Sequence, residues 1–245
     1  MQLEPISAAE GRIVIAHVHE YLRRQILGGT IPPGAVLSQV QLAQQLGVSR
    51  TPLREALRLL QEERLVVAEH NHRVRVAGIN LEELESLYAS RIMLETLALA
   101  LTVPRLSQGE LDALAHALDD MDAADSRHDT DAWEQGNRCF HALLATHAEE
   151  RIRQTIHRSI EASERYRRIK LQTVPDSRAV AKTDHTAIFA ACRERNIGAA
   201  VELLARHLAR TALTVIAHVS PEYEPTAVRT ALKLITSQSN NPVKL

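Results

Sequence analysis

The chain has 245 residues and a formal net charge of -1, with 45% hydrophobic, 24% charged and only 3% aromatic residues. This composition excludes general disorder and, at roughly 100–200 residues per domain, allows one large or two modest domains. No stretch approaches the ~18 consecutive apolar residues of a membrane span, and the N-terminus lacks the pattern of a secretory signal, so we expect a cytoplasmic protein without a membrane partner. Cys139 and Cys192 lie far apart and outside any CxxC spacing. They predict neither a disulfide framework nor a thiolate zinc finger, and we expect both to be buried.

Ala, Leu, Ile, Val, Glu and Arg dominate the sequence, which predicts a mainly α protein. Residues 1–78 contain nine Arg and seven Asp or Glu, a net charge of +2. Residues 79–220 contain seventeen Lys or Arg and twenty-one Asp or Glu, a net charge of -4. This asymmetry is mild, so a nucleic-acid partner has to be argued from the positions of the arginines.

The first segment, residues 8–78, has the pattern of a winged helix-turn-helix. Apolar residues recur at helical spacing over 13–26, a capped short helix follows over 38–47, and a third helix runs from Ser49 to about Glu62. Two strand-like runs, 65–68 and 74–76, then predict a small β-hairpin.

The third of these helices has a cationic face. Arg50, Arg54 and Arg58 are spaced i, i+4, i+8, while leucines and alanines occupy the opposite side. Such a helix fits the major groove of B-DNA, where Arg pairs with guanine, and Ser49 or Thr51 at its N-terminus can approach a phosphate. The alternative is an amphipathic helix whose arginines are solvated or paired with neighbouring glutamates. The surrounding helix-turn-helix and hairpin favour DNA binding.

The second segment, residues 79–220, shows only helical periodicity and predicts an antiparallel all-α bundle of six (or seven) helices. Asn80 and Ser107 are expected N-caps because each precedes a Glu by three residues. Residues 221–245 are expected to form a C-terminal tail, mobile or used in dimer contacts, with at most a turn or two of helix. The expected helices lie near 80–103, 107–126, 130–147, 149–172, 176–195 and 197–219.

Four residues of this bundle form a candidate metal site. Asn137 and His141 are i, i+4 on one helix, and His185 and His207 occur on the last two helices of the bundle. One amide oxygen and three imidazoles suit a divalent ion such as Zn, Ni or Mn. The alternative is that these histidines, like the others in the chain, only fill the core or the surface.

The run from Ile31 to Leu57, IPPG…LS…LA…LGVSRTPLREAL, closely resembles the DNA-binding domain of GntR-superfamily bacterial transcription regulators. The resemblance implies that Arg50, Thr51 and Arg54 contact the operator. It also implies that the hairpin tip near His72 and Arg73 reaches an adjacent groove. Family members usually have Gly at two positions where this chain has Arg, namely Arg64 and Arg73.

Four further stretches are similar to the FCD effector domain of the FadR-like branch: 87–95, 137–141, 184–188 and 199–208. The resemblance implies that an Asp or Asn and three His hold a metal in the bundle centre and that a carboxylate metabolite binds beside it. Most relatives have Asp where Asn137 stands, so the metal should be held less tightly in a site one charge more positive. Six helices are closer to the VanR-type subgroup than to the seven-helix FadR type.

Arg91 matches the Arg of the R-x-x-x-E segment of that family. In one interpretation its guanidinium pairs with the effector carboxylate in a bidentate geometry. In the other it forms an i, i+4 pair with Glu95 within the helix. Both interpretations remain open from the sequence.

We therefore predict a dimeric, metabolite-responsive transcription regulator that binds a short palindromic operator and is not an enzyme. A metal-dependent hydrolase or lyase with an accessory helix-turn-helix is the alternative, but it needs a general base, and no H-E-x-x-H motif is present. A third hypothesis treats the second domain as a dimerisation module without an effector.

Overall fold

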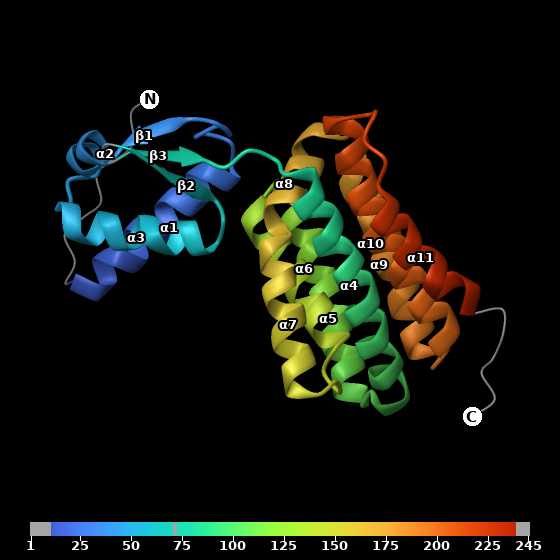
Figure 1. Ribbon diagram of the computed structural model, residues 1–245. Coiled ribbons are helices and arrows are strands. Elements are labelled where there is room, and N and C mark those ends of the chain that lie inside the picture. The colour runs from blue at the N-terminus through green and yellow to red at the C-terminus, as the bar shows by residue number, and fades with distance from the viewer. Residues whose placement is uncertain (1–10, 71–72, 239–245) are drawn as a thin grey trace. The chain divides into compact units, whose positions relative to one another are not determined.

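The computed structural model describes residues 11–70 and 73–238 (Figure 1). The chain divides between Ile79 and Asn80 into two compact units. As predicted, the fold is mainly α, with a winged helix-turn-helix in the N-terminal unit and a helical bundle in the C-terminal unit.

The N-terminal unit packs three helices against a small sheet. Its core is made by apolar residues such as Leu22, Leu46, Leu53 and Leu60, all fully buried. The elements are α1 (Gly11–Leu27), β1 (Val36–Ser38), α2 (Gln39–Leu46), α3 (Arg50–Glu62), β2 (Val66–Glu69) and β3 (Arg73–Val76).

The sheet has three strands rather than the two that the sequence predicts. Its antiparallel order is β1-β3-β2, and Leu37 of β1 lies opposite Val74 of β3. Only Leu37 of β1 is buried, while Val36 is exposed. A three-residue edge strand with a single inward side chain is too short to show alternation, which explains why the pattern did not reveal it.

Local signals set the ends of the two central helices. The Ser38 side chain accepts a hydrogen bond from Gln41 N at the start of α2, and Gly47 ends this helix in the left-handed conformation with φ 67°. Arg64, which links α3 to β2, is also left-handed with φ 57°. That conformation is strained for any residue with a Cβ and explains why glycine is usual at this position in the family.

The C-terminal unit contains eight α-helices within the described residues, not six or seven. They are α4 (Leu81–Thr102), α5 (Gln108–Ser126), α6 (Thr130–Leu143), α7 (Glu150–Ala162), α8 (Glu164–Thr173), α9 (Ser177–Arg193), α10 (Ile197–Val219) and α11 (Thr226–Gln238), with a 3-10 turn at Val103–Arg105. Asn80 and Ser107 cap α4 and α5 as predicted, Ser107 in a full capping box with Glu110.

Two differences account for the helix count. The helix expected over 149–172 is interrupted at Ser163, whose side chain is drawn into contacts with buried arginines, and it becomes α7 and α8. Residues 226–238, expected in a tail, form α11, which packs against α4 and α10 and buries Val228 and Ala231. The count of six therefore no longer supports a VanR-type assignment.

Helix α4 is the central element of this unit and contacts α7, α10 and α11. The stretch Leu81–Arg105 is long and apolar enough for a membrane span by length and composition, but half of its most apolar window is buried inside the unit. Leu84, Ile92 and Leu99 lie in the core of the unit, whereas Met93, Leu97 and Leu101 are exposed. Two charged residues of this helix, Arg91 and Glu95, are buried.

Glu85 attaches α11 to α4. Its carboxylate accepts hydrogen bonds from the backbone N–H of Ala227 and, at 3.4 Å, of Val228, while the Tyr223 hydroxyl donates to it at 2.7 Å. A carboxylate at a helix N-terminus satisfies orphan N–H groups and interacts favourably with the helix dipole. The last helix is therefore anchored by a buried polar contact as well as by apolar packing.

Candidate functional site

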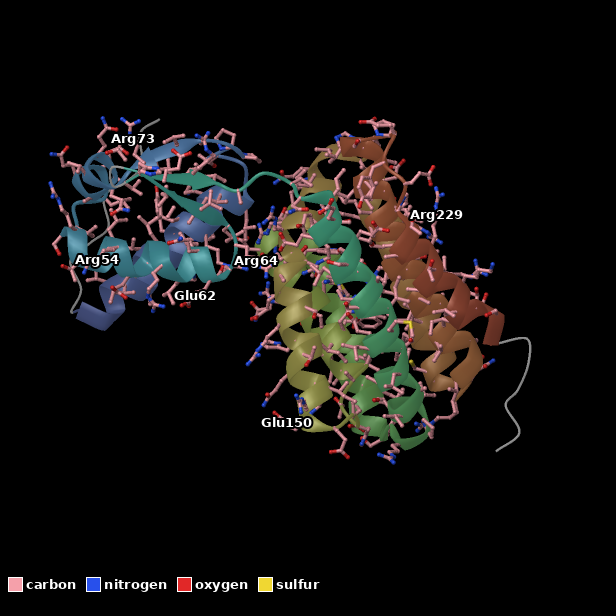
Figure 2. All side chains as sticks on the ribbon, in the orientation of Figure 1. Arg54, Glu62, Arg64, Arg73, Glu150 and Arg229 are labelled. Carbon is pink, nitrogen blue, oxygen red and sulfur yellow. The ribbon has the colours of Figure 1, made fainter. Side chains whose placement is uncertain are left out.

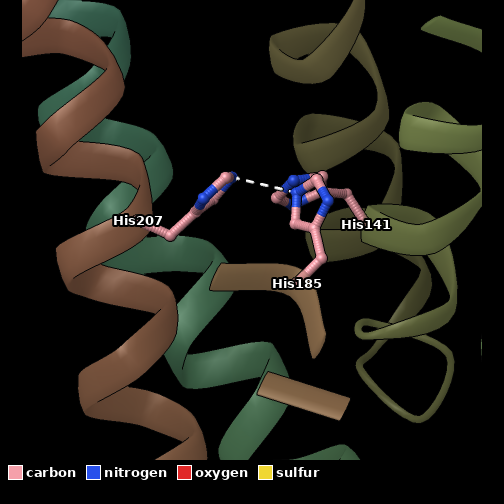
Figure 3. A group of neighbouring side chains, drawn as sticks. All are labelled: His141, His185 and His207. Atoms are coloured by element: carbon pink, nitrogen blue, oxygen red, sulfur yellow. Dashed lines mark hydrogen bonds between the residues drawn. The ribbon is translucent and has the colours of Figure 1, made fainter. Parts of the chain in front are cut away.

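Three buried histidines meet in the centre of the C-terminal unit. His141 on α6, His185 on α9 and His207 on α10 are 1%, 1% and 6% exposed, and one ligand nitrogen from each lies within 4.8 Å of the others (Figure 3). The Nε2 atoms of His185 and His207 are 3.2 Å apart. Two nitrogens bound at ~2.1 Å to one tetrahedral ion would be about 3.4 Å apart, so this spacing suits shared coordination.

Two carboxylates orient two of these rings. Glu95 Oε2 lies 2.9 Å from Nδ1 of His141, and Asp184 Oδ2 lies 3.1 Å from Nδ1 of His207. An ionised carboxylate only accepts hydrogen bonds, so each Nδ1 carries the proton and each Nε2 keeps its lone pair. Carboxylates in this position fix the tautomer of metal-binding histidines.

The protonation states favour metal coordination. Burial lowers the pKa of His141 to about 4, against the opposing effect of its hydrogen bond with Glu95, and burial also lowers the pKa of His185 and of His207. Burial opposes ionisation of Glu95, but the charge of Arg91 and the hydrogen bond from His141 lower the pKa of this carboxyl to about 2. At neutral pH the imidazoles are therefore neutral, which is the form that binds a metal.

Asn137 lies one turn before His141 on the same helix and is 1% exposed. Neither its Oδ1 nor its Nδ2 has a hydrogen-bond partner among the described residues. A buried amide without partners costs free energy, and such groups are commonly satisfied by water or an ion. Three neutral imidazoles and a free amide oxygen therefore fit a divalent ion.

Arg91 forms the intrahelical pair with Glu95 that one of the two interpretations predicts. It is 1% exposed, its Nε donates to Glu95 Oε1 at 2.6 Å and its Nη1 donates to Ser163 Oγ at 2.8 Å. Among the described residues, neither its Nη2 nor the buried hydroxyl of Tyr88 has a hydrogen-bond partner, and the Tyr88 ring centroid lies 5.2 Å from Arg91 Cζ. The pair with Glu95 thus exists and still leaves one face of the guanidinium available.

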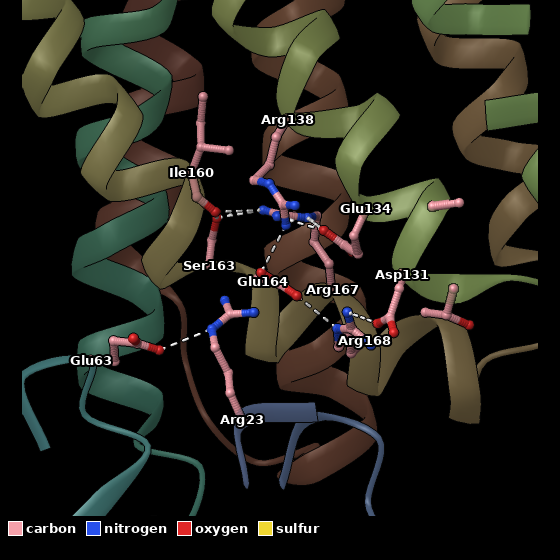
Figure 4. A network of polar contacts seen from close by, with 12 residues as sticks. Arg23, Glu63, Asp131, Glu134, Arg138, Ile160, Ser163, Glu164, Arg167 and Arg168 are labelled. Carbon is pink, nitrogen blue, oxygen red and sulfur yellow. Dashed lines mark hydrogen bonds and ion pairs between the residues drawn. The ribbon is translucent and has the colours of Figure 1, made fainter. Parts of the chain in front are cut away.

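A second group of charges ties the α7–α8 break to α6 (Figure 4). Arg167 donates to Glu134 through Nε and Nη2, the latter at 2.7 Å, and to Ser163 Oγ at 2.6 Å. Ser163 therefore accepts hydrogen bonds from both Arg91 and Arg167. Because Arg167 is fully matched by Glu134, it serves as a support and offers no free donor pair to a ligand.

Arg54 lies on α3 with its side chain exposed (Figure 2), and the other two predicted arginines of this helix, Arg50 and Arg58, are also exposed. Arg50 and Arg54 are exposed and have no hydrogen bond or ion pair with any residue in the described part of the chain. Arg58 is exposed but donates to Glu55 at 3.2 Å and also contacts Glu62. Only two of the three guanidinium groups are therefore free of internal partners.

The remaining DNA-contact candidates lie around this helix. Ser49 occupies the N-cap position of α3 without a side-chain cap hydrogen bond, and Thr51 is exposed in the first turn. Arg73 is exposed at the start of β3, while His72 lies outside the described residues.

A narrow crevice reaches the metal candidate from the side of α9. Its volume of about 20 Å³ holds one water molecule. It is lined by Leu118, Met121, Asp122, Asp125, Trp133, Arg178, Lys182, His185 and Thr186. Trp133 is the only tryptophan of the chain, and its ring centroid lies 6.4 Å from that of His185.

Sequence reasoning missed the supporting carboxylates. Glu95 had a role only as the partner of Arg91, and Asp184 had none, although it directly precedes His185. Asp184 contacts His207 and Arg210, both on the next helix, and no local spacing relates these residues. Cys139, expected to be buried, is exposed on α6, away from the face that carries Asn137.

Comparison with known proteins agrees with both units. Residues 15–76 match the family model of bacterial regulatory proteins of the gntR family, and residues 86–210 match the FCD domain. The chain is 28% identical over 191 residues to the HTH-type transcriptional regulator YdhC of Bacillus subtilis, covering 77% of this chain and 85% of YdhC. It is 29% identical over 198 residues to the HTH-type transcriptional repressor GlaR of Escherichia coli, covering 78% and 90%.

Solved structures share the architecture. A GntR-type transcriptional regulator from Rhodococcus sp. RHA1 aligns with a TM-score of 0.68 and 27% identity, covering 86% of this chain and 99% of the other. McbR/YncC of E. coli, at 22% identity, aligns with a TM-score of 0.67 over 84% and 98% and supports the fold. This chain therefore belongs to the GntR family of bacterial regulatory proteins, with an FCD domain, and is a DNA-binding transcriptional regulator.

Proposed function

We propose that this regulator binds a short palindromic operator as a dimer and senses a small carboxylate through a divalent metal ion held by Asn137, His141, His185 and His207. The observation that carries the proposal is the group of three buried, neutral imidazoles beside an amide that has no partner. A histidine cluster that only filled the core would not be expected to leave both amide atoms of Asn137 unsatisfied.

A bound divalent ion would supply a Lewis acid that attracts a carboxylate oxygen. The free Nη2 of Arg91 and the free hydroxyl of Tyr88 are hydrogen-bond donors that suit the same group. Because Glu95 holds Arg91 Nε and Ser163 holds Nη1, the guanidinium is oriented before the effector arrives. Such preorganisation lowers the entropy lost on binding.

For the DNA-binding unit, we propose that Arg50 and Arg54 read base edges and that Ser49 and Thr51 contact phosphate. Arg58 contributes after exchanging its glutamate partners for phosphate, and Arg73 with His72 contacts an adjacent groove. Two observations support this assignment: Ser49, Thr51 and the four arginines named here are exposed, and Arg50 and Arg54 have no internal partners among the described residues. The regulator has two states that differ in operator affinity, and the effector shifts the population toward the state that it binds more tightly.

The test of the sensor is a thermal-unfolding screen of purified protein against carboxylic acids, run as purified and after chelation and dialysis. We expect at least one acid to raise the melting temperature only when metal is present. Cobalt(II) can replace the native ion in a second measurement, because its visible absorption spectrum reports coordination by nitrogen and oxygen. Trp133 fluorescence offers a third, because metal binding at His185 should change the emission of this nearby ring. If chelation changes neither the cobalt absorption nor the Trp133 fluorescence, and no acid changes the melting temperature, the C-terminal unit is a dimerisation scaffold.

The test of the DNA-binding part is selection of operator sequences from a random pool, with the mass of the complex measured by light scattering. A palindromic consensus bound by two chains supports the proposal. A non-palindromic site bound by one chain contradicts it.

A further inference from the structure

Lys170 is a buried cation that has no counter-ion in the described part of the chain. It lies on α8 and is 6% exposed, and its ammonium makes one hydrogen bond, to Thr211 Oγ1 of α10 at 3.3 Å. No carboxylate of the described residues lies within ion-pair distance of its Nζ. An ammonium has three donors, so two of them have no protein partner.

The two neighbouring cations on the same helix, unlike Lys170, each have a carboxylate partner. Arg167 is paired with Glu134, and Arg168 is paired with Glu164 at 2.8 Å and with Asp131 at 2.5 Å. Lys170, one turn or less further along α8, has no equivalent partner. Buried charges in proteins are normally paired, so an unpaired one needs a specific explanation.

The carboxylate whose charge acts on Lys170 is already engaged. Asp184 interacts with His207 Nδ1 at 3.1 Å and with Arg210 Nη1 at 2.7 Å. Burial lowers the pKa of Lys170 to about 8, and the charge of Asp184 only partly opposes this effect. The side chain is thus still mainly protonated at neutral pH and keeps its positive charge in the interior.

Lys170 lies beside the histidine cluster. Its partner Thr211 is one turn after His207 on α10, and the Thr211 hydroxyl also donates to the His207 carbonyl at 3.2 Å. The charge of Lys170 acts on His185 and His207, whereas that of Arg91 acts on His141 and His207. The charges of Lys170 on α8 and of Arg91 on α4 therefore both act on His207.

Building on the proposed function, we propose that Lys170 is a second anion-binding residue of the effector site and that, together with Arg91, it selects an effector with two carboxylates. Arg91 is neutralised by Glu95 and needs only one further acceptor. Lys170 needs an anionic group of its own. A dicarboxylate meets both requirements, whereas a monocarboxylate leaves the lysine unpaired.

The test compares the wild-type protein with Lys170→Met, which keeps an unbranched side chain of similar length and removes the charge. Lys233→Met is the matched control, because Lys233 is an exposed lysine on α11. All proteins are loaded with zinc. Thermal unfolding and calorimetric binding are measured with linear dicarboxylates from oxalate to adipate and with the monocarboxylate of the same carbon number in each case.

Without any acid, we expect Lys170→Met to melt higher than the wild type, by on the order of 2–4 °C, because the unpaired charge is gone. Lys233→Met should melt as the wild type does. A lower melting temperature for Lys170→Met would identify Lys170 as a structural cation and overturn the proposal. This arm needs no knowledge of the natural effector.

With acids present, the wild type should bind at least one dicarboxylate roughly tenfold or more tightly than the matching monocarboxylate, and Lys170→Met should lose that preference. If no dicarboxylate is preferred, or if Lys170→Met retains the preference, the inference is wrong. Two other results would contradict the proposed function itself: that neither dicarboxylates nor monocarboxylates bind, or that their binding persists after the metal is removed. Monocarboxylate binding that depends on metal and Arg91 but not on Lys170 contradicts only the inference.

Discussion

Glu95 Oε2 lies 2.9 Å from His141 Nδ1, and this single contact determines which nitrogen of His141 is free to coordinate. The other oxygen of the same carboxylate holds Arg91 Nε at 2.6 Å. Glu95 therefore links the proposed metal ligand to the proposed effector ligand, and the two functions are expected to respond together when it is changed.

Replacing Glu95 with Gln should weaken zinc binding by about 10–100-fold, because the amide holds the His141 ring less firmly and makes its free nitrogen less basic. Competition with a chromogenic chelator measures the dissociation constant. Glu194→Gln, at the exposed C-terminal end of α9, is the control and should leave it unchanged. Equal zinc affinity in Glu95→Gln and wild type would show that the carboxylate plays no part in metal binding.

Replacing Asn137 with Asp should have opposite effects on the two forms of the protein. A carboxylate raises zinc affinity by on the order of tenfold, since an anionic ligand replaces a neutral one. Without metal, the same buried charge lowers the free energy of unfolding by roughly 1–3 kcal/mol. Asn137→Leu should abolish tight zinc binding without destabilising the metal-free form. Calorimetry in both states checks this, and an Asp variant with unchanged zinc affinity would remove residue 137 from the ligand set.

Arg54→Ala should weaken binding to the selected operator by about 1–3 kcal/mol and relax specificity at the base pair it contacts. Arg58→Ala should cost less, because Arg58 must first leave Glu55 and Glu62. Fluorescence anisotropy at a fixed salt concentration measures both. An Arg127→Ala variant, exposed in the C-terminal unit, serves as the control. An Arg54→Ala protein with full operator affinity is incompatible with α3 as the recognition helix.

Arg64 tests the cost of backbone strain. At φ 57° a side chain with a Cβ is strained, so Arg64→Gly should be more stable than Arg64→Ala by about 0.5–1 kcal/mol. Comparing the two variants, both of which lack the arginine side chain, isolates the backbone effect. Urea denaturation measures it, and an Ala variant as stable as the Gly variant would contradict a left-handed residue at this turn.

The contacts of Glu63 lead us to expect that the N-terminal unit loses stability in acid. It interacts with Arg23 Nε at 3.0 Å and His19 Nε2 at 2.5 Å, both on α1. Burial raises the pKa of Glu63, but the contacts with His19 and Arg23 outweigh it and lower the pKa below the usual 4.5. The folded unit therefore binds fewer protons than the unfolded chain in this range, and stability falls as the pH drops through and below about 4.5.

The corresponding measurement is hydrogen exchange of α1 and α3 in wild type and Glu63→Gln. The variant should be less protected at neutral pH, and the difference should shrink in acid as the wild-type carboxyl becomes protonated. A difference that stays constant with pH would mean that the ionised carboxylate is not the stabilising species.

Sequence patterns predicted those parts of the fold that depend on neighbouring residues. The caps at Ser38, Asn80 and Ser107 and the helical periods are local features, and the structure contains them. The α7–α8 break was missed because it depends on Ser163 meeting Arg91 from a helix 72 residues away in sequence. A break with a tertiary cause leaves no periodic signal.

For the candidate site, too, the sequence predicted what depends on local spacing and missed what depends on tertiary packing. The spacing of Asn137 and His141 placed them on one face of a helix, and His185 and His207 were expected on the last two helices of the bundle; the structure brings His141, His185 and His207 together. The sequence did not show that Lys170 is buried without a counter-ion among the described residues, because burial and ion pairing are properties of the packed interior. For Arg91, spacing alone could not decide between an intrahelical pair and a ligand contact; the structure contains the pair with Glu95, and the ligand contact stays a prediction.

The anchoring of α11 by Glu85 has a practical consequence for anyone dividing this protein into pieces. The FCD match ends at residue 210, inside α10. A fragment truncated there would retain Glu85 but lose Tyr223, Ala227 and Val228, which satisfy its carboxylate, and it would uncover the apolar face of α4 that α11 shields. The compact C-terminal unit thus includes α11, beyond the end of the FCD match, and fragments that end at residue 210 are expected to aggregate whatever their effector chemistry.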